Sequence, residues 1–196
     1  CYTVEDIILS TLETSMNIVQ KQGNALNIST GILVHGCNCL GAMGGGIAAG
    51  IREKWPTVYE AYKRHQELVG LRLGDVNFVA GNAFKDTPLA KHIHAFSDEL
   101  PPSVIVANAM TQQICGGDRD VVYVSYDAIS AVFARVALVA RQADLDVHFP
   151  LIGCGLAHGT WSEVSSRIES ALAPSIPGIL WTFDPVPAPD TQASLI

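Results

Sequence analysis

The sequence predicts an α/β domain of three layers, in which helices cover both faces of a largely parallel sheet. Two observations indicate this class. Short runs of consecutive apolar residues, typical of strands buried on both faces, recur along the chain, and helical stretches separate most of them. The chain has 196 residues, of which 48% are hydrophobic, so it is long and apolar enough to bury one sizeable core.

The elements can be assigned in chain order. Residues 3–14 (TVEDIILSTLET) carry apolar side chains at helical spacing, so residues 1–15 are expected to form an N-terminal helical extension. Strand-like runs follow at residues 16–19, 32–35, 76–80, 104–109, 147–151 and 179–183. Helical patterns lie between them at residues 46–54, 57–68, 125–143 and 161–172. The domain is expected to span residues 16–184, because the proline-rich residues 185–196 are typical of a flexible C-terminal tail.

Ser125 and Asp127 stand at the start of the longest predicted helix. Its apolar stripe consists of Ile129, Val132, Phe133, Val136, Val139 and Ala140. Ser125 suits the N-cap position, and Asp127 suits the first turn, where a carboxylate meets the positive end of the helix dipole. We therefore interpret both as helix-start residues and not as parts of a nucleophilic triad.

The composition argues against two classes of partner. Lys and Arg number 12 against 19 Asp and Glu, which gives a formal net charge of −7, and no segment gathers enough basic side chains to follow a nucleic-acid backbone. Residues 22–51 carry no formal charge, but glycines and polar side chains such as Asn24 and Asn27 interrupt them, so they do not predict a membrane span. We expect neither duplex nucleic acid nor a membrane as a partner.

Five cysteines are scattered along the chain, an odd number in a domain too large to need disulfides. They predict free thiols, a reducing compartment and a cytoplasmic location, and the start of the sequence shows no secretory leader. Cys37 and Cys39 lie near His35, but their spacing is not that of a zinc site and no second ligand pair follows. His92 and His94 alternate along a possible strand, again without a third ligand. We expect no metal and no cofactor.

Two glycine loops carry most of the functional information: residues 35–50 (HGCNCLGAMGGGIAAG) and 149–161 (FPLIGCGLAHGTW) each follow a strand and precede a helix. Glycine lets the backbone approach a ligand closely, and N–H groups at a helix start carry partial positive charge toward a phosphate. The first loop lacks the lysine of a P-loop, and its triple glycine stands too far after the strand for a dinucleotide-binding fingerprint. Two such loops at the carboxyl ends of parallel strands can hold a diphosphate from both sides. The alternative is that these glycines only form tight turns.

Four motifs in order make the chain from residue 16 to about 184 resemble a macro domain, the ADP-ribose-binding fold. They are Gly23-Asn24-Ala25-Leu26, ILVHGCNCLGAMGGGIAAGI, VANAMTQ and PLIGCGLAHGTW. The first long motif is especially similar to the ADP-ribose 1″-phosphate phosphatase branch, where a strand ends in His, Cys-Asn-Cys follows and a triple glycine opens the helix. The resemblance implies a three-layer α/β/α macro domain with a central mixed, mostly parallel sheet.

The resemblance also implies a ligand-binding set. It consists of Asn24, Ala25, Gly36, Asn38, Gly44, Gly45, Gly46, Ile47, Gly153, Cys154, Gly155, Leu156, Ala157, His158, Gly159 and Phe183. Asn24 stands where many macro domains have an aspartate that accepts from adenine N6; its amide can also accept there, and it leaves room for another base. Phe183 matches a position where the family often stacks an aromatic ring on adenine, and the alternative is a core phenylalanine.

His35, Asn38 and His158 are the catalytic residues that the resemblance implies. Asn38 is expected to orient the distal ribose, and His35 to attack phosphorus or transfer a proton. The alternative for His35 is a packed core histidine. His158 is expected to face the distal ribose or the phosphate. Related glycohydrolases carry an aspartate where Ala157 stands, which weakens a de-ADP-ribosylating interpretation.

The leading hypothesis is therefore a macro domain that binds ADP-ribose and related nucleotides and hydrolyses ADP-ribose 1″-phosphate to ADP-ribose and phosphate. A second enzymatic hypothesis is an ADP-ribosyl glycohydrolase that removes ADP-ribose from protein or nucleic acid, which makes ADP-ribosylated protein a possible partner. The third hypothesis is a binding module without catalytic activity.

Overall fold

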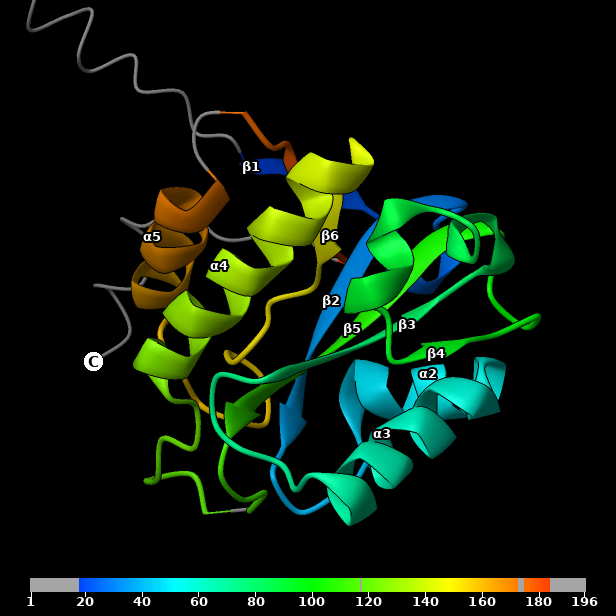
Figure 1. Cartoon of the computed structure of the whole chain (residues 1–196). Coiled ribbons are helices and arrows are strands. Elements are labelled where there is room, and N and C mark those ends of the chain that lie inside the picture. The colour runs from blue at the N-terminus through cyan, green and yellow to red at the C-terminus, as the bar shows by residue number, and fades with distance from the viewer. Residues whose placement is uncertain (1–17, 117, 173–174, 184–196) are drawn as a thin grey trace, which may run out of the picture.

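A seven-stranded sheet forms the centre of the computed structural model, which describes residues 18–116, 118–172 and 175–183 (Figure 1). The strands are β1 (Ile18–Gln22), β2 (Thr30–Asn38), β3 (Val76–Ala80), β4 (Ala95–Phe96), β5 (Ser103–Gln112), β6 (Val147–Phe149) and β7 (Gly178–Thr182). They lie in the order β1-β7-β6-β2-β5-β3-β4. Only the β3–β5 pair among them is antiparallel. The predicted mixed, mostly parallel sheet is confirmed.

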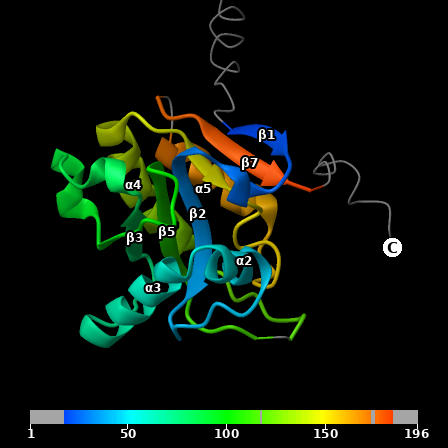
Figure 2. The ribbon, with the colours of Figure 1, turned by 90° about the vertical axis from the view of Figure 1, so that its right-hand side faces the viewer.

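Helices cover both faces of this sheet, as predicted. The helices α2 (Gly46–Lys54) and α3 (Pro56–Leu68) lie on one side, and α4 (Tyr126–Ala143) and α5 (Trp161–Leu172) lie on the other (Figure 1). Short 3₁₀ helices occupy Ala25–Asn27, Asn82–Phe84 and Pro88–His92. Turned by 90°, the molecule shows β1 beside β7 at one edge of the sheet (Figure 2).

Side chains of the central strand β2 alternate between the two helical layers, as the two-residue period of a strand requires. Ile32 and Val34 belong to the apolar cluster that includes residues of α4 and α5. Leu33 instead joins the cluster formed with Ile51 of α2 and Val58 of α3. This alternation fixes which side of the sheet each later residue of β2 faces.

Several boundaries differ from the predicted ones. The strand predicted to reach residue 151 ends at Phe149, because Pro150 follows and has no N–H to donate. The strand predicted for 104–109 extends to Gln112. Around His92 and His94, a 3₁₀ helix and the two-residue strand β4 stand in place of the strand that the alternation of the two histidines indicates. The helical extension 1–15 and the tail 185–196 lie outside the described residues, so the domain limits stay a prediction.

The start of α4 is as predicted. The Ser125 side chain accepts the backbone N–H of Ala128 at 3.2 Å, which caps the helix, and Asp127 lies in its first turn. In the ranges that the structure describes, none of the helices is long and apolar enough to cross a bilayer.

Candidate functional site

A cavity of about 1100 Å³ opens at the carboxyl ends of β1, β2, β5, β6 and β7, five strands that run parallel to one another. Its wall combines the segments that follow these strands with the first turn of α2. The lining residues are Gly23, Asn24, Ala25, Leu26, Gly36, Asn38, Ala42, Gly44, Gly45, Gly46, Ile47, Ala48, Gly50, Gln112, Cys115, Gly116, Pro150, Leu151, Ile152, Gly153, Cys154, Gly155, Leu156, Ala157, Trp181, Thr182 and Phe183. This edge is where ligands bind in α/β folds with parallel sheets.

The structure brings both glycine loops to this one cavity. Gly44, Gly45, Gly46 and Ile47 of the first loop line it together with the run from Gly153 to Ala157 of the second. The loops also touch, because a Cβ built on Gly45 would stand 2.9 Å from Cδ1 of Leu156. This shared position favours a ligand-binding role for the glycines over the alternative in which they only form tight turns.

The wall of the cavity is nearly free of ionisable groups. Among the described lining residues, none is Asp, Glu, Lys, Arg or His, and Cys115 and Cys154 contribute thiols. Burial raises the pKa of Cys154 to about 11, so this thiol is protonated at neutral pH. In the described part of the chain, no three His, Cys, Asp or Glu side chains gather as they do around a metal ion.

At the end of the first loop, the backbone N–H groups that start α2 have no side-chain cap. The helix α2 starts at Gly46, with Gly45 as an N-cap that has no side chain to occupy the first N–H groups. Gly46 has a φ of +55°, a left-handed conformation that favours glycine. Among the described residues, no atom lies within 4 Å of a Cβ built on Gly44 or Gly155, so both positions border open space.

Asn38 holds the start of this loop in shape. Its Oδ1 accepts the backbone N–H groups of Leu40 at 2.9 Å and of Ala42 at 3.2 Å, while its Nδ2 donates to the Ala42 carbonyl at 2.7 Å. Among the described residues Nδ2 has this one partner, so its second N–H is open to a ligand. The Asn38 side chain is thus both a loop anchor and part of the cavity wall.

The opposite end of the cavity holds Asn24, Trp181 of β7 and Phe183. The Asn24 Oδ1 accepts the Leu26 N–H at 2.9 Å and caps the 3₁₀ helix there. Phe183, directly after β7, is 74% exposed, so its ring is not a core residue. The side chain of Gln22 donates to the Phe183 carbonyl at 2.9 Å and ties the end of β1 to this rim.

The structure does not bring His35 to the cavity. Its ring is completely buried, and Nε2 lies 2.6 Å from Oδ1 of Asn108. Asn108 Nδ2 donates to Asn77 Oδ1, so Asn108 Oδ1 is the acceptor and His35 carries its proton on Nε2. Burial lowers the pKa of His35 to about 4, although the bond to Asn108 acts in the opposite direction. The ring is therefore neutral and shielded, unlike the attacking group expected from the sequence.

Strand alternation explains this position. His35 stands two residues after Leu33 and shares its side of the sheet, toward α3, where Asn108 also donates to the Val58 carbonyl. Gly36 faces the other way and lines the cavity. The two-residue period was present in the sequence and could have revealed the difference.

His158 and Gly159 are two further expected residues that do not line the cavity. The His158 Nδ1 lies 3.0 Å from the Val121 carbonyl, which turns the ring toward the loop before α4. The Gly159 N–H donates to the Gly153 carbonyl at 2.8 Å, and a Cβ there would stand 2.5 Å from Val124 Cγ1. Gly159 therefore closes the second loop on itself.

Gln112, Cys115 and Trp181 line the cavity without having been expected there. Gln112 ends β5, the strand beside β2, and pairs with Asn38. Its place as the last residue of the VANAMTQ run was the available signal, because neighbouring parallel strands end at the same edge. Cys115 lies in the following loop, whose path depends on tertiary contacts.

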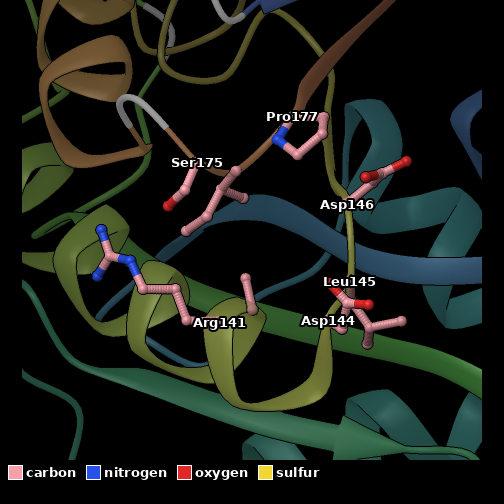
Figure 3. Close-up of a pocket in the computed structure, with 8 residues that line it drawn as sticks. Arg141, Asp144, Leu145, Asp146, Ser175 and Pro177 are labelled. Atoms are coloured by element: carbon pink, nitrogen blue, oxygen red, sulfur yellow. The ribbon is translucent and has the colours of Figure 1, made fainter.

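A second cavity, of about 460 Å³, lies at the amino ends of β6 and β7, beyond the last turn of α4 (Figure 3). Arg141, Asp144 and Asp146 contribute its charged groups. The guanidinium of Arg141 and the carboxylate of Asp146 point away from each other in Figure 3. The charged groups do not converge on one point, so the chemistry is better sought in the larger cavity.

Comparison with curated proteins finds relatives with named activities, while no family model matches the chain. The chain is 49% identical over 153 residues to an ADP-ribose 1″-phosphate phosphatase of Scheffersomyces stipitis, a match that covers 72% of this chain and 83% of that protein. It is 36% identical over 58 residues to a protein of the same name from Aspergillus oryzae, and that match covers 29% of each chain. It is 25% identical over 173 residues to a DNA ADP-ribosyl glycohydrolase of Thermus aquaticus, covering 88% of this chain and 42% of that protein. The chain thus spans less than half the length of the second and third relatives.

Solved structures agree with this picture of the fold. A macrodomain protein of Streptomyces coelicolor superposes with a TM-score of 0.62 at 28% identity, covering 84% of this chain and 98% of that one. A protein of Bacteroides thetaiotaomicron gives a TM-score of 0.68 at 26% identity, covering 86% and 99%. The sequence identity to the Scheffersomyces protein and these two superpositions therefore support the same fold for this chain.

Proposed function

The chain belongs to the macro domain family, and we propose that it binds ADP-ribose and hydrolyses ADP-ribose 1″-phosphate to ADP-ribose and inorganic phosphate. The observation that carries the proposal is the meeting of two glycine loops at one cavity of about 1100 Å³. The phosphatase name of the Scheffersomyces relative supports the choice of substrate.

We assign the middle of the cavity to the diphosphate. The uncapped start of α2 offers backbone N–H groups from one side, and residues 153–157 offer backbone from the other. Adenine is assigned to the end with Asn24 and Phe183, and the distal ribose with its phosphate to the end with Asn38 and Gln112. A protein with a net charge of −7 can bind an anion this way because backbone dipoles replace basic side chains.

In the proposed reaction, the oxygen of a water molecule bonds to phosphorus while the bond between phosphorus and the C1″ oxygen breaks. A proton from the water passes to the departing C1″ oxygen. The free N–H of Asn38 can orient the phosphate or the ribose. His35 stabilises the strand behind the site in this proposal, and does not take part in the transfer.

Phosphate release from ADP-ribose 1″-phosphate tests the activity. Purified protein with excess chelator should release phosphate at a rate proportional to protein concentration. If calorimetry shows binding of ADP-ribose but no phosphate is released, the phosphatase activity is refuted and the assignment of the cavity as an ADP-ribose site still holds.

Two other functions each have an observation in their favour. The similarity to a DNA ADP-ribosyl glycohydrolase over 88% of this chain favours removal of ADP-ribose from nucleic acid. Turnover of ADP-ribosylated DNA or protein, with none of ADP-ribose 1″-phosphate, would establish that reaction.

The scarcity of titratable groups among the described lining residues favours a binding module without catalytic activity. For such a module, calorimetry would show ADP-ribose binding without turnover of any of these substrates.

We also propose a reducing compartment for this protein. Cys37, Cys39, Cys115 and Cys154 are all free thiols, and two of them line the cavity. Alkylation during isolation without reductant should modify Cys115 and Cys154. Recovery of either residue in a disulfide would contradict the proposal.

A further inference from the structure

Tyr62 of α3 places the hydroxyl of a fully buried side chain against the residue that anchors the first glycine loop. Its Oη donates to the backbone carbonyl of Asn38 and lies 3.4 Å from Asn38 Oδ1. The ring packs in a cluster with Cys37, Met43 and Met110, and none of its surface is exposed. Tyr62 does not itself line the cavity.

The hydroxyl is suited to act as a permanent donor. Burial raises the pKa of Tyr62 above its ordinary value, so the proton stays on Oη throughout the neutral range. A buried hydroxyl without a partner is unfavourable, so the bond to Asn38 also holds Tyr62 in place. A phenylalanine would fill the same space in the cluster without making this bond.

The contacts continue from Asn38 into the loop. The Asn38 side chain binds both the N–H and the carbonyl of Ala42 and the N–H of Leu40. Two residues beyond Ala42 the chain enters the triple glycine and then α2. A displacement of the Asn38 backbone would therefore move the loop anchor and the N–H that Asn38 offers to the cavity.

We propose that Tyr62 is a positioning residue of the ligand site: its hydroxyl fixes Asn38 and, through Asn38, the first glycine loop in the geometry that receives the ligand. This inference rests on the proposed function for the identity of the ligand. It assigns to α3, a helix outside the cavity wall, a direct part in shaping the site.

The test is Tyr62→Phe, with Tyr59→Phe as the matched control. Tyr59 lies one turn earlier on α3 and packs against the same cluster, but its hydroxyl makes no hydrogen bond to any of the described residues. Amide exchange of residues 39–46, the Kd of ADP-ribose and the steady-state constants for ADP-ribose 1″-phosphate are measured for both variants and the wild type.

Tyr62→Phe should accelerate exchange in residues 39–46, raise the Kd of ADP-ribose about tenfold and lower kcat/KM by at least as much, while Tyr59→Phe changes none of them. A lower Tm for Tyr62→Phe with unchanged exchange, Kd and KM would reduce Tyr62 to a packing role and overturn the proposal. Should the variant fold too poorly for kinetics, exchange in residues 39–46 relative to the strand β5 still decides the question.

The two proposals fail differently. If the wild type binds ADP-ribose but releases no phosphate, the phosphatase proposal is refuted. The Tyr62 proposal is then decided by the Kd of ADP-ribose and the amide exchange data. A wild type that does not bind ADP-ribose at all overturns both.

Discussion

Leu156 of the second glycine loop meets Gly45 of the first. A Cβ on Gly45 would stand 2.9 Å from Leu156 Cδ1, and both residues line the large cavity. Leu156 is nevertheless 67% exposed, so this contact is made by a side chain with little other support from the protein. A ligand bound between the loops would cover the exposed part of this side chain.

Replacing Leu156 with alanine should weaken ligand binding without destabilising the fold. Burying a leucine side chain against a ligand is worth about 1.5 kcal/mol, which corresponds to a rise of roughly tenfold in the Kd of ADP-ribose. The free energy of unfolding should change by less than about 0.5 kcal/mol, because the side chain is exposed. Leu138→Ala, at a 49% exposed leucine of α4, is the control for calorimetry and urea unfolding. Equal Kd values for the two variants would contradict a ligand contact at Leu156.

Gly44→Val should block the cavity. The position has open space around a built Cβ and no positive φ, so the protein can accept the side chain. A ligand in that space would meet crowding of about 1–3 kcal/mol, which raises its Kd about tenfold to a hundredfold. Thermal melting should be unchanged relative to Ser130→Val, an exposed site on α4. A melting temperature that falls in step with binding would instead indicate a structural glycine.

Phe183→Ala should weaken binding of the adenine end. Stacking of a base on an aromatic ring is worth about 1–3 kcal/mol, so the Kd of ADP-ribose should rise about tenfold or more. Phe183→Trp should keep most of the affinity, since an indole also offers a flat face. Calorimetry with both variants decides this, and an alanine variant with wild-type affinity would show that the exposed ring does not contact the base.

His35 should make stability depend on pH between about 6.5 and 4. Its folded pKa, about 4, lies below the ordinary 6.5, so in this window the unfolded chain binds a proton that the folded chain excludes. The stabilisation is complete above the unfolded pKa and is lost as pH falls toward the folded one, by about 2 kcal/mol between pH 7 and pH 5.

Urea unfolding of the wild type and of His35→Gln at these two pH values measures that loss. Glutamine can still donate to Asn108 but does not titrate, so the variant should lose about 2 kcal/mol less than the wild type on acidification. Matching losses would mean that the wild-type ring takes up its proton without unfolding.

The sequence was most informative where local signals coincide. The bounds of α2, β3 and α5 agree with the predicted ones, because glycine or loop residues end each apolar pattern sharply. The antiparallel direction of β3 had no such signal: an apolar run reads the same in both directions, and its orientation depends on the connection through α3. The mixed character of the sheet came only from the family resemblance.

The site was predictable in its backbone and less so in its side chains. The glycine loops carry their geometry in the local sequence, and all of the expected residues from Gly44 to Ile47 line the cavity. His158 could not be placed this way, because its left-handed backbone and its contact with Val121 depend on a distant loop. Tyr62 gave no local signal either, since a tyrosine in an amphipathic helix is indistinguishable from an ordinary core residue.

The near absence of titratable groups along the described cavity wall has a consequence for the pH profile of the enzyme. The Cys154 pKa is about 11, so this thiol does not change its charge across the neutral range, and those lining residues include no carboxylate, amine or imidazole. The phosphate monoester itself titrates near pH 6. Above the pH at which the fold weakens, the profile of kcat/KM should therefore follow the ionisation of the substrate, and substrates with a different phosphate pKa should shift it by the same amount.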